Sequence, residues 1–180
     1  MTLNLGIALL KESRGKKDLQ MARLMALDVG EVRIGVAVSD ATGWLASPYT
    51  TLHVSRDEQQ TWEAIRRLID ETGAEGLVVG LPISLDGQIH AQGARIQDFA
   101  ERLRPHISVP LTFWDERLST VEAQRLLAQS GQSERRKKRS GRSQTKRRKR
   151  GQEIDALAAA VILQDYLDQL VSSKAEEKKL

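Results

Sequence analysis

The sequence predicts a single α/β domain built on a mixed β-sheet. Segments with the hydrophobic pattern of strands alternate with segments patterned as helices, the order expected of an α/β fold. A tight turn joins the first two strand segments and adds an antiparallel hairpin to that order. The chain has 180 residues, enough for one domain with its own core. We divide it into an accessory or disordered N-terminal extension (residues 1–22), the domain (23–172) and a charged tail (173–180).

The first three strands come early in the chain. Residues 24–29 form a short apolar run that ends at an acid and Gly30, which is the pattern of a buried strand. Residues 33–39 are the second strand, and the short turn before them makes the pair an antiparallel hairpin. Residues 50–54 are predicted as a third strand that follows a bend at Pro48.

Helices and strands alternate after this point. Ser55 and Glu58 have the spacing of a capping box, and the helix that they open carries its apolar residues on one face and ends at Gly73. The remaining elements, in chain order, are a buried strand, a helix, a strand and two helices, at residues 76–82, 91–104, 109–116, 119–131 and 152–172.

The composition excludes several classes of function. There is no cysteine, so the chain has no disulfide framework, no Cys-ligated zinc or iron–sulfur site and no thiol nucleophile. No segment approaches the roughly 18 consecutive apolar residues of a membrane span. The first residues lack the basic region and cleavage site of a signal peptide. We therefore expect a cytoplasmic protein with no membrane contact.

Three positions carry acids where a packed fold disfavours them. Asp28 lies inside an apolar strand, Asp115 and Glu116 end another strand, and Asp155 opens a very apolar helix. A carboxylate in such a setting costs several kcal/mol unless it is paired, hydrogen-bonded or bound to a cation. Acids that project from strand ends toward one helix offer oxygen ligands to divalent metal ions. Two such ions about 4 Å apart activate a water and stabilise the leaving oxygen of a phosphodiester.

Each acid also has a simpler explanation. Asp155 complements the dipole of its own helix if it has no other role. Asp115 or Glu116 caps the following helix or pairs with Arg117 in the same way. Asp28 is harder to explain, because mid-strand acids between Leu and Val are uncommon. The shared position of these acids at strand ends and one helix start favours a common site.

The charge of the chain is distributed very unevenly. Residues 134–150, here called the basic belt, contain eleven Lys and Arg and one acid, a local charge of +10, so the rest of the chain carries −6. Basic side chains that meet phosphates release counterions and give salt-sensitive, sequence-independent affinity. The belt has no aromatic residue, which disfavours base stacking as the main mode of recognition. The alternative is a solvated loop that binds polyanions incidentally.

Four blocks of sequence resemble the YqgF family, also called RuvX-like: LDVGEVRIGVAVSD (residues 27–40), VVGLPISLDG (78–87), DERLSTVEA (115–123) and IDALAAAVILQDYL (154–167). They occur in the family's order and cover nearly all of the chain. The resemblance implies a ribonuclease H-like fold, with a five-stranded mixed sheet of three antiparallel and then two parallel strands and helices on both faces.

The resemblance also implies a nuclease that requires Mg²⁺ or Mn²⁺. Asp28, Glu116 and Asp155 match the family's catalytic, metal-binding acids, and Asp115 is a further candidate ligand or a partner of Arg117. Bacterial members are described as processing the 5′ end of precursor 16S ribosomal RNA, in ribosome biogenesis. The family was first proposed to resolve Holliday junctions in branched DNA. The family's linker between the last two helices is usually shorter than the belt found here.

The basic residues complete the predicted site. Gly30 and Gly35 let the backbone approach a phosphate or simply form the hairpin turn. Arg33 and Arg117 contact the scissile phosphate or neutralise the neighbouring acids when metal is scarce. The predicted nucleic-acid-binding set is Arg33, Arg117, Arg135, Arg136, Lys137, Lys138, Arg139, Arg142, Lys146, Arg147, Arg148, Lys149 and Arg150.

The leading hypothesis is a metal-dependent nuclease that acts on structured RNA or branched DNA. A catalytically silent nucleic-acid-binding module is the alternative from another class, and the presence of all three acids argues against it. An actin-like ATPase, suggested by LDVG, needs two such domains, and 180 residues supply one. We expect a monomer, with a dimer as the alternative.

Overall fold

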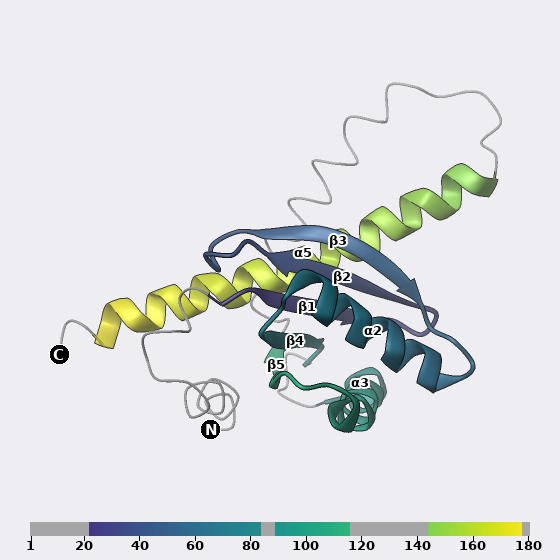
Figure 1. Ribbon diagram of the computed structural model, residues 1–180, viewed down its shortest axis with the longest axis horizontal. Helices are drawn as coiled ribbons and strands as arrows, with labels where there is room; N and C mark the ends of the chain where they lie inside the picture. Colours follow the sequence, from purple (N-terminus) through teal and green to yellow (C-terminus); the bar gives the residue numbers. More distant parts are fainter. Residues whose placement is uncertain (1–21, 84–88, 116–143, 178–180) are drawn as a thin grey trace.

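The computed structural model describes residues 22–83, 89–115 and 144–177 (Figure 1). A single five-stranded sheet and its covering helices make up this part of the chain. The elements are β1 (Leu24–Val29), β2 (Arg33–Ser39), β3 (Ala46–His53), α2 (Glu58–Thr72), β4 (Gly76–Leu81), α3 (Ala91–Leu103), a 3₁₀ turn (Arg104–His106), β5 (Leu111–Asp115) and α5 (Gln144–Glu177).

The strand order is β3-β2-β1-β4-β5. β1 pairs antiparallel with β2, and β2 pairs antiparallel with β3, whereas β1–β4 and β4–β5 are parallel. The prediction of three antiparallel and then two parallel strands is therefore confirmed. Because β1, β4 and β5 are parallel, their carboxyl ends meet at one edge of the sheet.

The two faces of the sheet are covered by different helices. Residues at odd positions of β1 join the core under α2 and α3, which includes Trp62 and Phe99. Even positions join a second core with Leu163 and Tyr166 of α5. This alternation follows from the two-residue period of a strand. Figure 1 shows the result, with α5 running across the face of the sheet opposite to α2.

Two details near β3 and α2 differ from the sequence prediction. Pro48 lies within β3 rather than before it, and Tyr49 is an extra residue where the register with β2 shifts. Proline is tolerated there because β3 is an edge strand. The N-cap of α2 is Asp57, whose carboxylate accepts a hydrogen bond from the Gln59 amide at 3.1 Å, so the predicted capping role of Ser55 is wrong. Gly73 ends the helix as predicted, with φ of 66°.

The last helix is longer than its sequence pattern predicts. α5 begins at Gln144, eight residues before the predicted start, and continues to Glu177. Residues 144–150 of the basic belt are therefore helical, and in Figure 1 this end of α5 extends beyond the sheet. Lys and Arg are good helix formers, so the backbone continues through them despite their mutual repulsion. The predicted helix 119–131 and the first part of the belt lie outside the described residues.

Candidate functional site

Asp28 lies near the carboxyl end of β1 and faces α5. Its neighbours Leu27 and Val29 point into the core under α2 and α3, so alternation places Asp28 on the opposite face with Ala26. Its partner across the β1–β2 ladder is Gly35. The carboxylate is thus half-buried between the sheet and the crossing helix.

Gly35 brings α5 into contact with the backbone of β2. A Cβ atom at this position would lie 1.9 Å from the carbonyl oxygen of Asp155, so no other residue fits without a shift of the helix. Neither of the two interpretations of Gly35 drawn from the sequence, approach of the backbone to a phosphate or a hairpin turn, accounts for this contact with α5. Because α5 lies so close to β2 here, Asp155 of α5 is near Asp28 on the adjacent strand β1.

The two carboxylates influence each other. The pKa of Asp28 is raised from 3.8 to about 6, first because burial disfavours its charged form and second because the negative charge of Asp155 is close. An ionised carboxylate accepts hydrogen bonds but donates none, so the two ionised side chains cannot hydrogen-bond to each other. An oxygen-liganded divalent cation between them would remove this repulsion, and the pair fits Mg²⁺ or Mn²⁺ chemically.

Arg33 supplies a positive charge to one member of this pair. Its Nε donates to Oδ2 of Asp155 at 2.5 Å, and the two side chains are 39% and 23% exposed. Gly151, one helical turn before Asp155, makes room for the guanidinium: a Cβ there would lie 3.2 Å from Nη1 of Arg33. Arg33 therefore lies along the flank of α5 from position 151 to position 155.

Asp115 occupies a different environment. It ends β5 beside Leu81 of β4 and is 4% exposed. Trp114 belongs to the core under α5, so alternation directs Asp115 toward the α2 and α3 face, away from that of Asp28. Glu116 and Arg117, the next two residues, lie outside the described part of the chain, as do Arg135, Arg136, Lys137, Lys138, Arg139 and Arg142.

The described residues contain two of the predicted metal ligands in one place. Within residues 22–83, 89–115 and 144–177, no group of three or more His, Asp or Glu side chains is arranged to hold a metal ion. Asp28 and Asp155 are the part of the predicted set that the structure brings together. Five further predicted residues lie in the first two turns of α5: Lys146, Arg147, Arg148, Lys149 and Arg150.

Comparison with known proteins shows the family of this chain. Residues 22–169 match the model of the RuvX family, which is described as a Holliday junction resolvase. The protein belongs to the RuvX family. The matched region runs from the residues before β1 to the last turns of α5, and it includes Asp28, Arg33 and Asp155.

The alignments with two curated relatives span almost the whole length of each relative. A "Putative pre-16S rRNA nuclease" of Thermoanaerobacter pseudethanolicus is 40% identical over 81% of this chain and 96% of its own. A protein of the same name from Roseiflexus sp. is 42% identical over 81% of this chain and 94% of its own. T. thermophilus RuvC in complex with a Holliday junction substrate aligns with a TM-score of 0.50 at 13% identity, over 82% of this chain and 96% of RuvC. This last likeness confirms the ribonuclease H-like fold.

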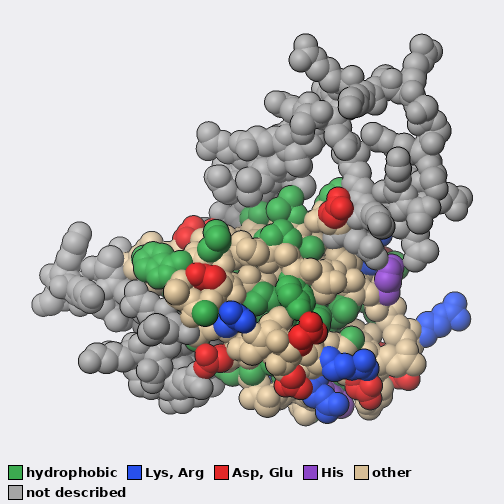
Figure 2. Space-filling model, turned by 45° about the horizontal axis from the view of Figure 1, so that its top comes forward, with side chains coloured by type: hydrophobic (Ala, Val, Ile, Leu, Met, Phe, Trp, Pro, Cys, Tyr) green, Lys and Arg blue, Asp and Glu red, His purple; other side chains and the backbone are tan. Residues whose placement is uncertain are grey.

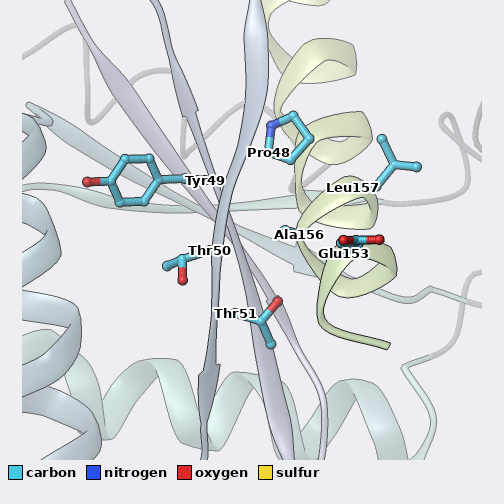
Figure 3. A pocket seen from close by; sticks show the side chains of 7 residues that line it. All are labelled: Pro48, Tyr49, Thr50, Thr51, Glu153, Ala156 and Leu157. Carbon is cyan, nitrogen blue, oxygen red and sulfur yellow. The ribbon is translucent and has the colours of Figure 1, made fainter. Parts of the chain in front are cut away.

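A groove between β3 and α5 was not predicted from the sequence. It has a volume of about 510 Å³ and is lined by the residues labelled in Figure 3: Pro48, Tyr49, Thr50, Thr51, Glu153, Ala156 and Leu157. Figure 3 shows Pro48 and Thr51 on the α5 side of the strand, whereas Tyr49 extends to the other side. Successive helical residues are rotated by about 100°, so Glu153 and Leu157 lie across α5 from Asp155. The groove is therefore separated from the carboxylate pair by the helix itself.

Sequence reasoning also missed the role of Gly151. A glycine inside a helix costs about 1 kcal/mol relative to alanine, which marks the position as one that needs space. The structure shows that the space holds the guanidinium of Arg33. A glycine at this position was the available signal in the sequence, and it was not used in the prediction.

In the part of the chain that the structure describes, no helix is long and apolar enough to cross a membrane.

Proposed function

We propose that this RuvX protein is a metal-dependent nuclease that hydrolyses phosphodiester bonds in nucleic acid. The observation that carries the proposal is the placement of Asp28 against Asp155, where burial and like charge raise the pKa of Asp28 to about 6. A fold that retains two repelling carboxylates on one side of its sheet is expected to use them on a cation.

Asp28, Asp155 and Glu116 would hold the metal ion, with Asp115 as a further candidate. Its buried position on the other face makes Asp115 better suited to orient the end of β5 than to join Asp28. Bound Mg²⁺ or Mn²⁺ would supply an acidified water and positive charge near the leaving oxygen. Ala26 and Ala159 are fully buried in the core between the sheet and α5; Ala26 is two residues before Asp28, and Ala159 is one helical turn after Asp155.

The basic belt would attract the nucleic-acid backbone to the carboxylates. On the face in Figure 2, acidic and basic side chains lie interspersed, and the described residues there form no continuous basic surface. The belt carries a local charge of +10 and the rest of the chain −6, so the belt is the part of the chain best suited to attract a polyanion. Arg150 is five residues before Asp155 in the same helix, about 7.5 Å along its axis. A phosphate held at the helical end of the belt, beside Arg150, would therefore lie close to Asp155.

The substrate we favour is the precursor of 16S ribosomal RNA, processed at its 5′ end. Support comes from the names of the curated relatives, which are about 40% identical over most of this chain. The second candidate substrate is a Holliday junction, supported by the family description and by the likeness to RuvC. We further propose that the protein works in the cytoplasm, as a monomer.

One experiment separates these functions. Wild type, Asp28→Asn and Asp168→Asn are incubated with a precursor 16S leader RNA and with a four-way DNA junction, in Mg²⁺ and in Mn²⁺. Asp168 is an exposed carboxylate on α5, bonded to Gln164, and serves as the matched control. We expect wild type and Asp168→Asn to cleave the RNA with equal rates and Asp28→Asn to lose at least 10²-fold, about 3 kcal/mol of barrier.

The pattern of cleavage decides between the candidates. Cleavage of the junction alone would select the resolvase. Cleavage that survives Asp28→Asn would exclude the proposed metal site. Tight binding of either substrate without cleavage by wild type in both metals would select the catalytically silent module.

A further inference from the structure

We propose that Arg33 is a displaceable counter-ion of Asp155: it neutralises this carboxylate in the metal-free protein, leaves it when metal binds, and then contacts the phosphodiester. Arg33 would thereby couple metal loading to substrate binding. The inference rests on the proposed metal site at Asp28 and Asp155.

The contact between Arg33 and Asp155 is built into the fold. Arg33 is the first residue of β2, and its side chain faces α5 for the same reason that Gly35 does. Two glycines open the space around it: Gly35 lets the helix reach the strand, and Gly151 lets the guanidinium lie against the helix. The 2.5 Å bond from Nε to Oδ2 uses one of five donors of the guanidinium.

The arrangement suits a pair that can be broken. Arg33 is 39% exposed, so its guanidinium has a route into solvent and toward a bound strand. Ion pairs with this exposure contribute little to stability, whereas a divalent cation bound by several oxygen ligands is held much more strongly. A cation shared by Asp28 and Asp155 also neutralises both carboxylates, whereas Arg33 contacts only Asp155. A bound metal ion is therefore expected to displace the Arg33 guanidinium from Asp155.

Displacement leaves a guanidinium beside the site where the substrate phosphate must lie. Its planar fork of N–H groups matches two phosphate oxygens and gives a bidentate contact. The same side chain then opposes metal binding when the substrate is absent and favours substrate binding when the metal is present.

The first test measures metal binding by the purified full-length protein, using calorimetric titration with Mn²⁺ alone. Arg33→Gln removes the competitor, and we expect it to bind Mn²⁺ roughly two- to five-fold more tightly than wild type, as the loss of an ion pair of this exposure implies. Gly151→Ala is the second variant: it crowds the guanidinium, keeps every charge and preserves the helix. It should shift the affinity in the same direction by a smaller factor.

The second test measures nucleic-acid binding against salt concentration, with and without Ca²⁺. In Ca²⁺ the slope of log affinity against log salt concentration should be smaller for Arg33→Gln than for wild type, by about the amount that one phosphate contact contributes. Without metal the two slopes should coincide, because Asp155 holds Arg33 in the wild type. Arg102→Gln is the matched control, since Arg102 pairs with Glu58 and Asp98 on the helices that cover the other face. Arg33→Lys should recover part of the slope.

Each outcome supports or overturns the inference. Tighter Mn²⁺ binding by both variants, with a slope difference only in Ca²⁺, supports it. Unchanged Mn²⁺ affinity in Arg33→Gln and Gly151→Ala overturns it and leaves the proposed nuclease intact. An equal slope difference with and without Ca²⁺ also overturns it, because Arg33 would then bind phosphate without leaving Asp155. Failure of the wild type to bind any metal would remove both this inference and the proposed function.

Discussion

Replacing Asp28 with asparagine is expected to stabilise the metal-free protein at neutral pH. The pKa of Asp28 is about 6 in the folded protein against 3.8 for an ordinary Asp, mainly because burial disfavours the charged form and also because Asp155 repels it. The difference between these two values corresponds to about 3 kcal/mol. Asparagine has nearly the same shape and no charge, so Asp28→Asn should recover at most this amount.

The pH dependence follows from the direction of the shift. Between about pH 3.8 and pH 6 the folded state binds the Asp28 proton more tightly than the unfolded state. The contribution of Asp28 to the free energy of unfolding is therefore fully present below about pH 4. It falls as the pH rises through 6 and is lost above that pH. The advantage of Asp28→Asn should be near zero at pH 4 and reach its full value by pH 7.5.

Thermal unfolding in the presence of a metal chelator measures this advantage. For a protein of this size, about 3 kcal/mol corresponds to a rise in Tm of roughly 6–12 °C. Asp168→Asn on the exposed side of α5 is the control and should leave Tm unchanged at both pH values. A variant no more stable than wild type at pH 7.5, or equally stabilised at pH 4 and 7.5, would refute the electrostatic reasoning.

Three further predictions test the same geometry. Mg²⁺ or Mn²⁺ should raise the Tm of wild type but not of Asp28→Asn, which a thermal melt with and without metal measures. Gly35→Ala should lower stability by at least about 2 kcal/mol in urea unfolding, because its Cβ meets the Asp155 carbonyl; Gly73→Ala, in open space at the end of α2, should cost less. Glutamine at all five basic positions of residues 146–150 should reduce the salt dependence of nucleic-acid binding by the amount that up to about five phosphate contacts contribute. An unchanged salt dependence would show that this segment does not bind the nucleic acid.

The strands were predictable because their signal is local. Residues 24–29 and 33–39 carry apolar runs bounded by turn residues, and both strands were found at these bounds. β3 was predicted too short because Pro48 was taken as a break, although an edge strand tolerates proline. α5 was predicted to start too late because the density of like charge was taken as the mark of a loop. Helix propensity and continuity with the packed half of α5 outweigh that repulsion.

The site was predictable only in its parts. Asp28 and Asp155 stood out individually as acids in apolar surroundings, but they are 127 residues apart and no sequence spacing connects them. A common site was hypothesised from their positions in the predicted elements, and the family resemblance implied the same two acids; the family itself is confirmed. The bond between Arg33 and Asp155, across 122 residues, depends on the crossing of α5 over β2, which no local pattern encodes.

The charge arithmetic of the sequence acquires a spatial meaning from α5. From the sequence, the +10 belt is expected to attract phosphates, and acids in the −6 remainder are expected to bind divalent cations. The last five basic residues of the belt and Asp155 lie on one continuous helix, so part of the belt is held at a fixed distance from the carboxylates. Gly151 stands between them and admits Arg33, the basic side chain from the sheet. Basic residues that attract phosphate and a carboxylate that repels it therefore lie within about three turns of one helix. A cation bound at Asp155 would reduce this repulsion and release Arg33 to contact phosphate.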